Sequence, residues 1–172
     1  MLTIEGWQKL DRGARMISPL VVALFLMFLL MVPLRLPNFG TIAPSVALMA
    51  VFYWAVYRPD LFGAIAVGIL GFVQDALSGA PLGLNALVFL LAYSSVVSQR
   101  QLFLAHGFFI LWWGFALTAV IAGFMAWAIQ SFLHLGLVPF DPVLYQAAAT
   151  ISLFPPAAWL FGKVQRAFLS GL

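Results

Sequence analysis

Cysteine is absent from this chain of 172 residues, and charged side chains make up only 8% of it. The lack of cysteine excludes disulfides, thiolate metal sites and cysteine nucleophiles. The shortage of charge argues against a soluble fold, because ordinary soluble domains carry about 25% charged residues. The sequence also lacks a His-Glu-x-x-His zinc pattern, a glycine-rich phosphate loop and paired carboxylates on one helix. We therefore expect no enzyme activity, no metal and no cofactor.

The chain is instead rich in apolar residues, which make up 65% of it and raise the mean hydropathy to +1.09. A soluble fold could not bury that much apolar surface. The length suffices for one helical bundle, but not for a bundle with a sizeable soluble domain attached. We predict an all-α integral membrane protein with a single domain over residues 1–172.

The few charges divide the chain into apolar intervals, because a charge at the bilayer centre costs about 3 kcal/mol or more. These intervals, and the turn residues between them, predict a bundle of six transmembrane helices. The predicted spans are residues 16–34, 42–57, 61–77, 83–98, 107–131 and 142–162. Residues 1–15 precede them as a basic cytoplasmic segment, which is either a short surface helix or a frayed tail.

The distribution of basic residues predicts the orientation of the bundle, since cytoplasmic loops are enriched in Lys and Arg. With both termini in the cytoplasm, Arg35 is the one basic residue on the opposite side. The cytoplasmic segments then hold the other seven, namely Lys9, Arg12, Arg15, Arg58, Arg100, Lys163 and Arg166. The basic pI of 9.7 has the same origin and gives no support to nucleic-acid binding.

Aromatic rings occur near the predicted cytoplasmic ends of two spans. They are Tyr53, Trp54, Tyr57 and Trp159. Amphipathic rings prefer the membrane interface, so we expect these four to anchor the bundle there.

Asp75 lies at the end of the third predicted span, where an acid needs a partner. A stripe of small residues shares its helical face and would let another helix approach closely; it consists of Ala64, Gly68 and Gly71. Three roles are open for the carboxylate. It could be satisfied by Ser78, Asn85 and the first N–H groups of the next helix as a structural cap, it could bind a partner or ligand, or it could serve proton relay or catalysis.

A second stripe of small residues runs along the fifth predicted span at helical spacing. It consists of Ala119, Gly123 and Ala126, followed by Gln130. Such a stripe predicts close helix packing, either within the protein or against another membrane protein.

The sixth predicted span contains the pair Pro155-Pro156, which lacks two amide donors. The carbonyls of Ile151 and Ser152 therefore lose their usual helical partners, and a kink is favoured. These carbonyls could accept hydrogen bonds from a partner helix or a small ligand.

The run between the third and fourth predicted spans reads Gln74-Asp75-x-x-Ser78-Gly79-x-Pro81-x-Gly83-x-Asn85. With this run, six spans in about 170 residues and a basic start, the chain resembles the MreD family of rod shape-determining membrane proteins. The resemblance covers nearly the whole chain in size and topology, with residue-level likeness concentrated in residues 71–85. It singles out a partner-binding or structural motif made of Gln74, Asp75, Ser78, Gly79, Pro81, Gly83 and Asn85.

The resemblance implies a noncatalytic scaffold of the bacterial cell-elongation complex in the inner membrane. Such a protein is needed for rod shape and lateral peptidoglycan synthesis. Its implied partners are MreC and, through the complex, MreB, RodA and a class B transpeptidase, with membrane lipids around it. The resemblance also implies a bundle similar to the vitamin-binding S components of energy-coupling-factor transporters.

That second similarity supplies the alternative function, a solute- or lipid-binding membrane protein of a transporter. It predicts an enclosed pocket and, in many members, an Ala-x-x-x-Ala stripe on the first span. The first span here has a single alanine, Ala23. The interior positions of the predicted bundle also lack the spread of polar groups that a hydrophilic vitamin requires, which leaves a hydrophobic ligand such as a lipid open.

Overall fold

The computed structural model describes residues 20–28, 44–133, 136 and 139–169. All regular secondary structure in this part of the chain is helical, which confirms the predicted all-α class. The helices are residues 20–28, α3 (Val46–Tyr57), α4 (Ala64–Ser78), α5 (Leu84–Ala105), α6 (Phe108–Leu133) and α7 (Asp141–Leu169). The segment 1–15 and much of the first predicted span lie outside the described residues.

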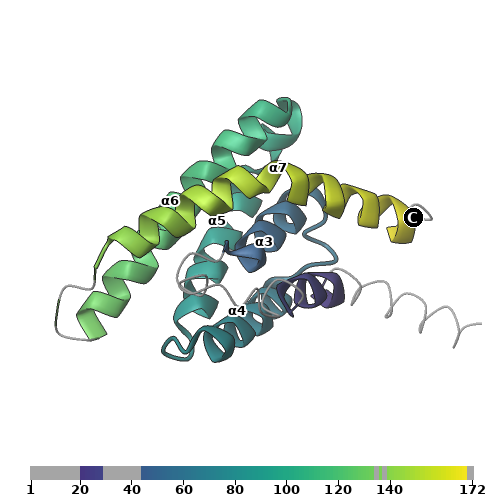
Figure 1. Cartoon of the computed structure of the whole chain (residues 1–172). Coiled ribbons are helices and arrows are strands. Elements are labelled where there is room, and N and C mark those ends of the chain that lie inside the picture. The colour runs from purple at the N-terminus through teal and green to yellow at the C-terminus, as the bar shows by residue number, and fades with distance from the viewer. Residues whose placement is uncertain (1–19, 29–43, 134–135, 137–138, 170–172) are drawn as a thin grey trace, which may run out of the picture.

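Helix α3 lies at the centre of the bundle and contacts each of α4, α5, α6 and α7 (Figure 1). Every residue from Val46 to Val56 is buried. A helix that is apolar on all sides is stable when other helices cover it on all sides. Its start is fixed by Ser45, whose hydroxyl accepts a hydrogen bond from the Leu48 N–H at 3.4 Å.

A cluster of aromatic rings ties α3 to the helices around it. Phe52 of α3 contacts Phe103 of α5, Phe115 of α6 and Phe154 of α7, with ring centroids 5.2 to 5.6 Å apart. Phe115 and Phe154 stack on each other at 4.0 Å. The core of the bundle is therefore a set of rings from four helices that meet at Phe52.

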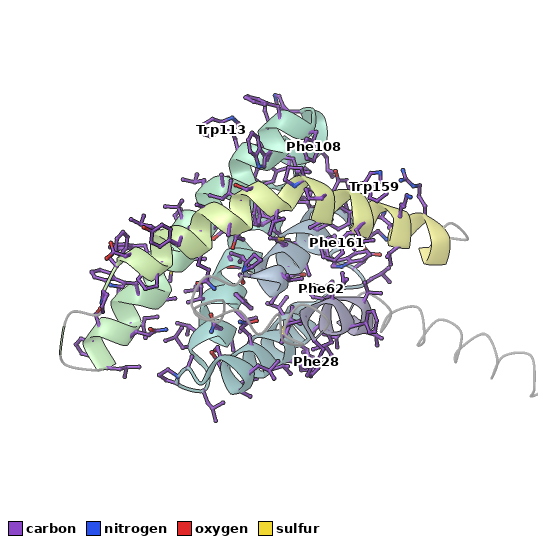
Figure 2. All side chains as sticks on the ribbon, viewed as in Figure 1. Phe28, Phe62, Phe108, Trp113, Trp159 and Phe161 are labelled. Atoms are coloured by element: carbon purple, nitrogen blue, oxygen red, sulfur yellow. The ribbon has the colours of Figure 1, made fainter. Side chains whose placement is uncertain are left out.

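The outer surface of the bundle is apolar as well as its core. Phe109, Trp113, Leu117 and Phe124 of α6 are all more than half exposed, and Figure 2 shows Phe108 and Trp113 away from the centre of the bundle. Among the described residues, α5 and α6 are long and apolar enough to cross a membrane, and α3 and α4 are shorter apolar helices. Apolar groups on both the inside and the outside are typical of a helical membrane protein.

Two helices continue past the predicted ends of their spans. Helix α5 ends at Ala105 rather than 98, and α7 ends at Leu169 rather than 162. The sequence placed these ends beside Arg100 and Lys163, because a charge marks the limit of the apolar layer. Helical hydrogen bonding does not depend on that layer, so both helices continue beyond the charges.

The anchoring role predicted for four aromatic residues was wrong for two of them. Trp54 and Tyr53 are only 0% and 5% exposed, whereas Tyr57 and Trp159 face outward. The reason is the central position of α3, whose end is covered by α7, and the Tyr53 hydroxyl donates to Oε1 of Gln165 on that helix at 3.0 Å. Trp159 lies under the Lys163 ammonium, which is 3.8 Å from the ring centroid.

Helix α7 continues through Pro155 and Pro156, and Figure 1 shows it changing direction along its length. The Ile151 carbonyl, which has no N–H donor at Pro155, accepts a hydrogen bond from Nε1 of Trp112 on α6 at 3.0 Å. The proline pair thus makes a carbonyl available, and a neighbouring helix of the same chain binds it.

Replacing Trp112 by Phe should lower the free energy of unfolding by about 1–3 kcal/mol, because the Ile151 carbonyl would lose its donor. Thermal unfolding of the purified protein in mild detergent measures this effect. Trp113→Phe is the matched control, since Trp113 is the next residue and is 61% exposed. Equal losses of stability in the two variants would contradict a structural role for this bond.

Candidate functional site

Asp75 is 0% exposed, and its carboxylate accepts three hydrogen bonds at the start of α5. Oδ2 accepts from the Gly83 N–H at 2.8 Å, and Oδ1 accepts from the Asn85 N–H at 3.0 Å and from Asn85 Nδ2 at 2.8 Å. The first N–H groups of a helix have no partner within it. Asp75 of α4 therefore caps α5, and its negative charge lies at the positive end of that helix.

The turn between α4 and α5 brings the capped residues back to the carboxylate. Gly79 ends α4 with φ of 69°, and Gly83 precedes α5 with φ of 96°. Both values lie in the left-handed region, which glycine enters without the steric cost of a Cβ. Between them, the Pro81 carbonyl accepts a hydrogen bond from the Leu84 N–H at 3.1 Å. Gly83 has no side chain to cap α5 itself, so the cap comes from Asp75.

Ser78 and Gln74 flank the carboxylate on α4. The Ser78 hydroxyl donates to the Gln74 carbonyl at 2.8 Å and also lies 3.4 Å from the Asp75 carbonyl. It therefore bonds back to carbonyls near the end of its own helix, as serine hydroxyls in helices commonly do. The side-chain amide of Gln74 makes no hydrogen bond within the part of the chain that the structure describes.

The chemistry available to this site is limited by these contacts. Both oxygens of Asp75 are already accepting hydrogen bonds, and the donors are backbone or amide groups. Among the described residues, no group of three or more histidines and acids is arranged to hold a metal ion. The arrangement therefore acts as a helix cap that joins α4 to α5.

A cavity of about 280 Å³ lies beside this cap, where α3, α4, α5, α6 and α7 meet. Five of the seven motif residues line it, namely Gln74, Ser78, Gly79, Pro81 and Asn85. The remaining described lining residues are Ser45, Leu48, Ala80, Val88, Phe89, Ala119, Ala122, Gly123, Ala126, Gln130, Val143, Gln146, Ala147 and Thr150. The motif therefore forms one wall of a cavity whose location and lining the sequence did not predict.

The two stripes of small residues have different surroundings. On α4, a Cβ added to Gly71 would lie 2.6 Å from the backbone nitrogen of Ala86, whereas one added to Gly68 would meet nothing within 4 Å. Of these two glycines, Gly71 is the one that lies at a close approach between helices. The stripe on α6 lines the cavity, and a Cβ on Gly123 would lie 3.3 Å from the Val143 side chain of α7.

The spread of polar groups that the sequence analysis did not find is present around the cavity. Its described lining includes four side-chain amides and three hydroxyls, which come from Gln74, Asn85, Gln130, Gln146, Ser45, Ser78 and Thr150. Thr150 donates to the Gln146 carbonyl at 2.6 Å and accepts from the Ser45 N–H at 3.0 Å, which links α7 to α3. These residues lie up to 105 positions apart in the chain, so no local pattern could have grouped them.

The family model described as rod shape-determining protein MreD matches residues 11–164. The match covers the described helices almost to the end of α7, as well as the turn that carries the seven-residue motif. No curated protein and no solved structure matches the chain.

Proposed function

The chain belongs to the MreD family of rod shape-determining proteins, and we propose that it acts as a noncatalytic membrane scaffold of the bacterial cell-elongation complex. The observation that carries this proposal is the family match over residues 11–164. Family membership supports a role in determining rod shape, and the apolar outer surface fits a membrane protein. The scaffold would support lateral peptidoglycan synthesis through contacts with other proteins of the complex.

We further propose that the chain crosses the inner membrane six times with both termini in the cytoplasm. The cavity supports this arrangement, since the start of α3, the turn at residues 79–83 and the start of α7 all lie beside it. Successive helices therefore run in alternating directions. The basic residues lie toward the opposite ends of these helices. Arg58 directly follows α3, Arg100 lies in the second half of α5, and Lys163 lies in the second half of α7. A bundle similar to the S components of energy-coupling-factor transporters stays a prediction.

The proposed direct partner is MreC, with MreB, RodA and a class B transpeptidase joined through the complex. The turn after Asp75 offers a contact surface, because Leu82 at its tip is 74% exposed. The cap and the two glycines hold this turn in one shape. A rigid turn that presents an apolar side chain loses little conformational entropy when a partner binds it.

Replacing Leu82 by Ser should reduce the amount of MreC that copurifies in mild detergent by roughly fivefold or more, since an exposed apolar contact would be lost. The folding of the protein should not change, because Leu82 makes little contact within it. Leu102→Ser is the matched control, since Leu102 is 57% exposed on α5, outside the turn. A photo-crosslinker at position 82 should label MreC.

Two results would contradict the scaffold. One is failure of the unaltered protein to retain MreC in mild detergent. The other is a culture depleted of this protein whose cells stay rod-shaped. If MreC is lost from the Leu102→Ser variant as well as from Leu82→Ser, the contact is not specific to the turn. That result would leave the scaffold proposal standing.

A further inference from the structure

We propose that the cavity beside the Asp75 cap binds a small uncharged molecule that carries amide or hydroxyl groups. Its volume of about 280 Å³ is close to the lower end of the range of about 300–1,000 Å³ that is usual for ligand pockets. Its described lining comes from five helices and contains seven polar side chains, none of them charged. This site is separate from the proposed contact with MreC at Leu82, which does not line the cavity.

Two of the lining amides are available for a ligand. The side chains of Gln74 and Gln130 make no hydrogen bond with any other described residue, and both are half-buried. Each side-chain amide has donors and an acceptor. Half-buried amides with no partner among the described residues favour an occupant that can both accept and donate, which a molecule with amide or hydroxyl groups does.

Asn85 adds an acceptor of fixed orientation. Its Nδ2 donates to Oδ1 of Asp75 at 2.8 Å, and an ionised carboxylate can only accept hydrogen bonds. The amide must therefore keep its NH₂ group toward Asp75, which leaves the Asn85 carbonyl oxygen for the cavity that this residue lines. The cap thus positions one ligand contact as well as the start of α5.

The charge of the ligand follows from the same contacts. The described lining residues include no Lys or Arg that could bind an anion, and the nearby carboxylate of Asp75 would repel one. The carboxylate of Asp75 is not available to bind a cation, since it is 0% exposed and already accepts three hydrogen bonds. A molecule without charge avoids both penalties.

The room for the ligand comes from small residues on two facing helices. Ala119, Ala122, Gly123 and Ala126 of α6 lie across from Ala147 of α7, and all five line the cavity. Larger side chains at these positions would fill the space. This gives a substitution that tests the site without touching its polar groups.

The test uses the purified full-length protein in mild detergent and N-acetylalanylalanine amide, an uncharged probe with three amide groups. We expect a saturable rise in the thermal unfolding midpoint of about 5 °C or more when the probe is far above its dissociation constant. N-acetylalanylalanine, which has nearly the same shape and one negative charge, should bind at least tenfold more weakly.

Ala126→Leu should weaken binding of the amide probe tenfold or more by filling the cavity. Ala148→Leu is the matched control, since Ala148 is exposed on α7 and does not line the cavity. If Ala126→Leu does not fold, Gln130→Leu carries the test and should weaken binding about fivefold or more.

Three outcomes would overturn the proposal. The first is the absence of a saturable shift with the amide probe, and the second is equal binding of the amide and the acid. The third is photolabelling of the cavity by a lipid with a diazirine on its acyl chain, blocked by Ala126→Leu and not by the amide probe. That result would assign the cavity to a lipid chain. Retention of MreC is measured in a separate experiment, so the scaffold proposal and the ligand proposal can be contradicted independently of each other.

Discussion

Replacing Gly71 by Ala should lower the free energy of unfolding by about 3 kcal/mol or more. The added Cβ would lie within 2.6 Å of the Ala86 nitrogen and even closer to its Cα. Because the obstacle is backbone rather than the end of a flexible side chain, α4 and α5 must move apart. That movement would also stretch the hydrogen bonds between Asp75 and the start of α5. Thermal unfolding in mild detergent measures the loss.

Gly68→Ala is the matched control, one helical turn earlier on the same helix. A Cβ at Gly68 meets nothing within 4 Å. The variant should keep its stability or gain about 0.5–1 kcal/mol, since alanine loses less conformational entropy in a helix than glycine does. Equal losses of stability in the two variants would contradict the close approach of α4 and α5 at Gly71.

Replacing Asp75 by Ala should lower the free energy of unfolding by about 3–5 kcal/mol. The substitution leaves two backbone N–H groups and the Asn85 amide without their acceptor in a buried site. It also removes a negative charge from the positive end of α5. Thermal unfolding in detergent and the amount of folded protein in the membrane both report this loss.

Asp75→Asn should lose less, about 1–3 kcal/mol, because one side-chain oxygen can still accept while the new NH₂ group faces donors. Asp60→Asn is the control for loss of a surface carboxylate: its side chain is 65% exposed and 3.6 Å from Nε of Arg58. An exposed pair of this kind contributes up to about 1 kcal/mol. A fully stable Asp75→Asn protein that no longer retains MreC would show that the carboxylate serves partner binding instead of the cap.

The helices could be predicted from the sequence because a membrane-spanning helix requires a long apolar stretch bounded by polar or charged residues. Charges are expensive within the apolar layer, so Arg35, Arg58, Arg100 and Lys163 separate the apolar stretches. The ends of α5 and α7 could not be predicted in the same way. Helical hydrogen bonds form inside and outside the layer alike, so the charge at Arg100 does not end α5.

The candidate site could be predicted in part. The contact between Asp75 and Asn85 spans only ten residues, and the run from Gln74 to Asn85 contains both the acid and the glycines of its turn. The exposure of individual rings could not be predicted. Trp54 resembles an interface anchor in the sequence, yet it is buried because α3 is surrounded by the other helices.

By itself, the sequence determined the helical membrane class, the family resemblance and the acid that needs a partner. Each of these depends on composition or on residues that are close along the chain. The tertiary structure decided which polar side chains meet. Gln74, Gln130 and Thr150 are on three helices, and they surround one cavity because α4, α6 and α7 pack around α3. Packing of separate helices is a long-range property, since it depends on the fit of whole surfaces and not on the spacing within any one segment.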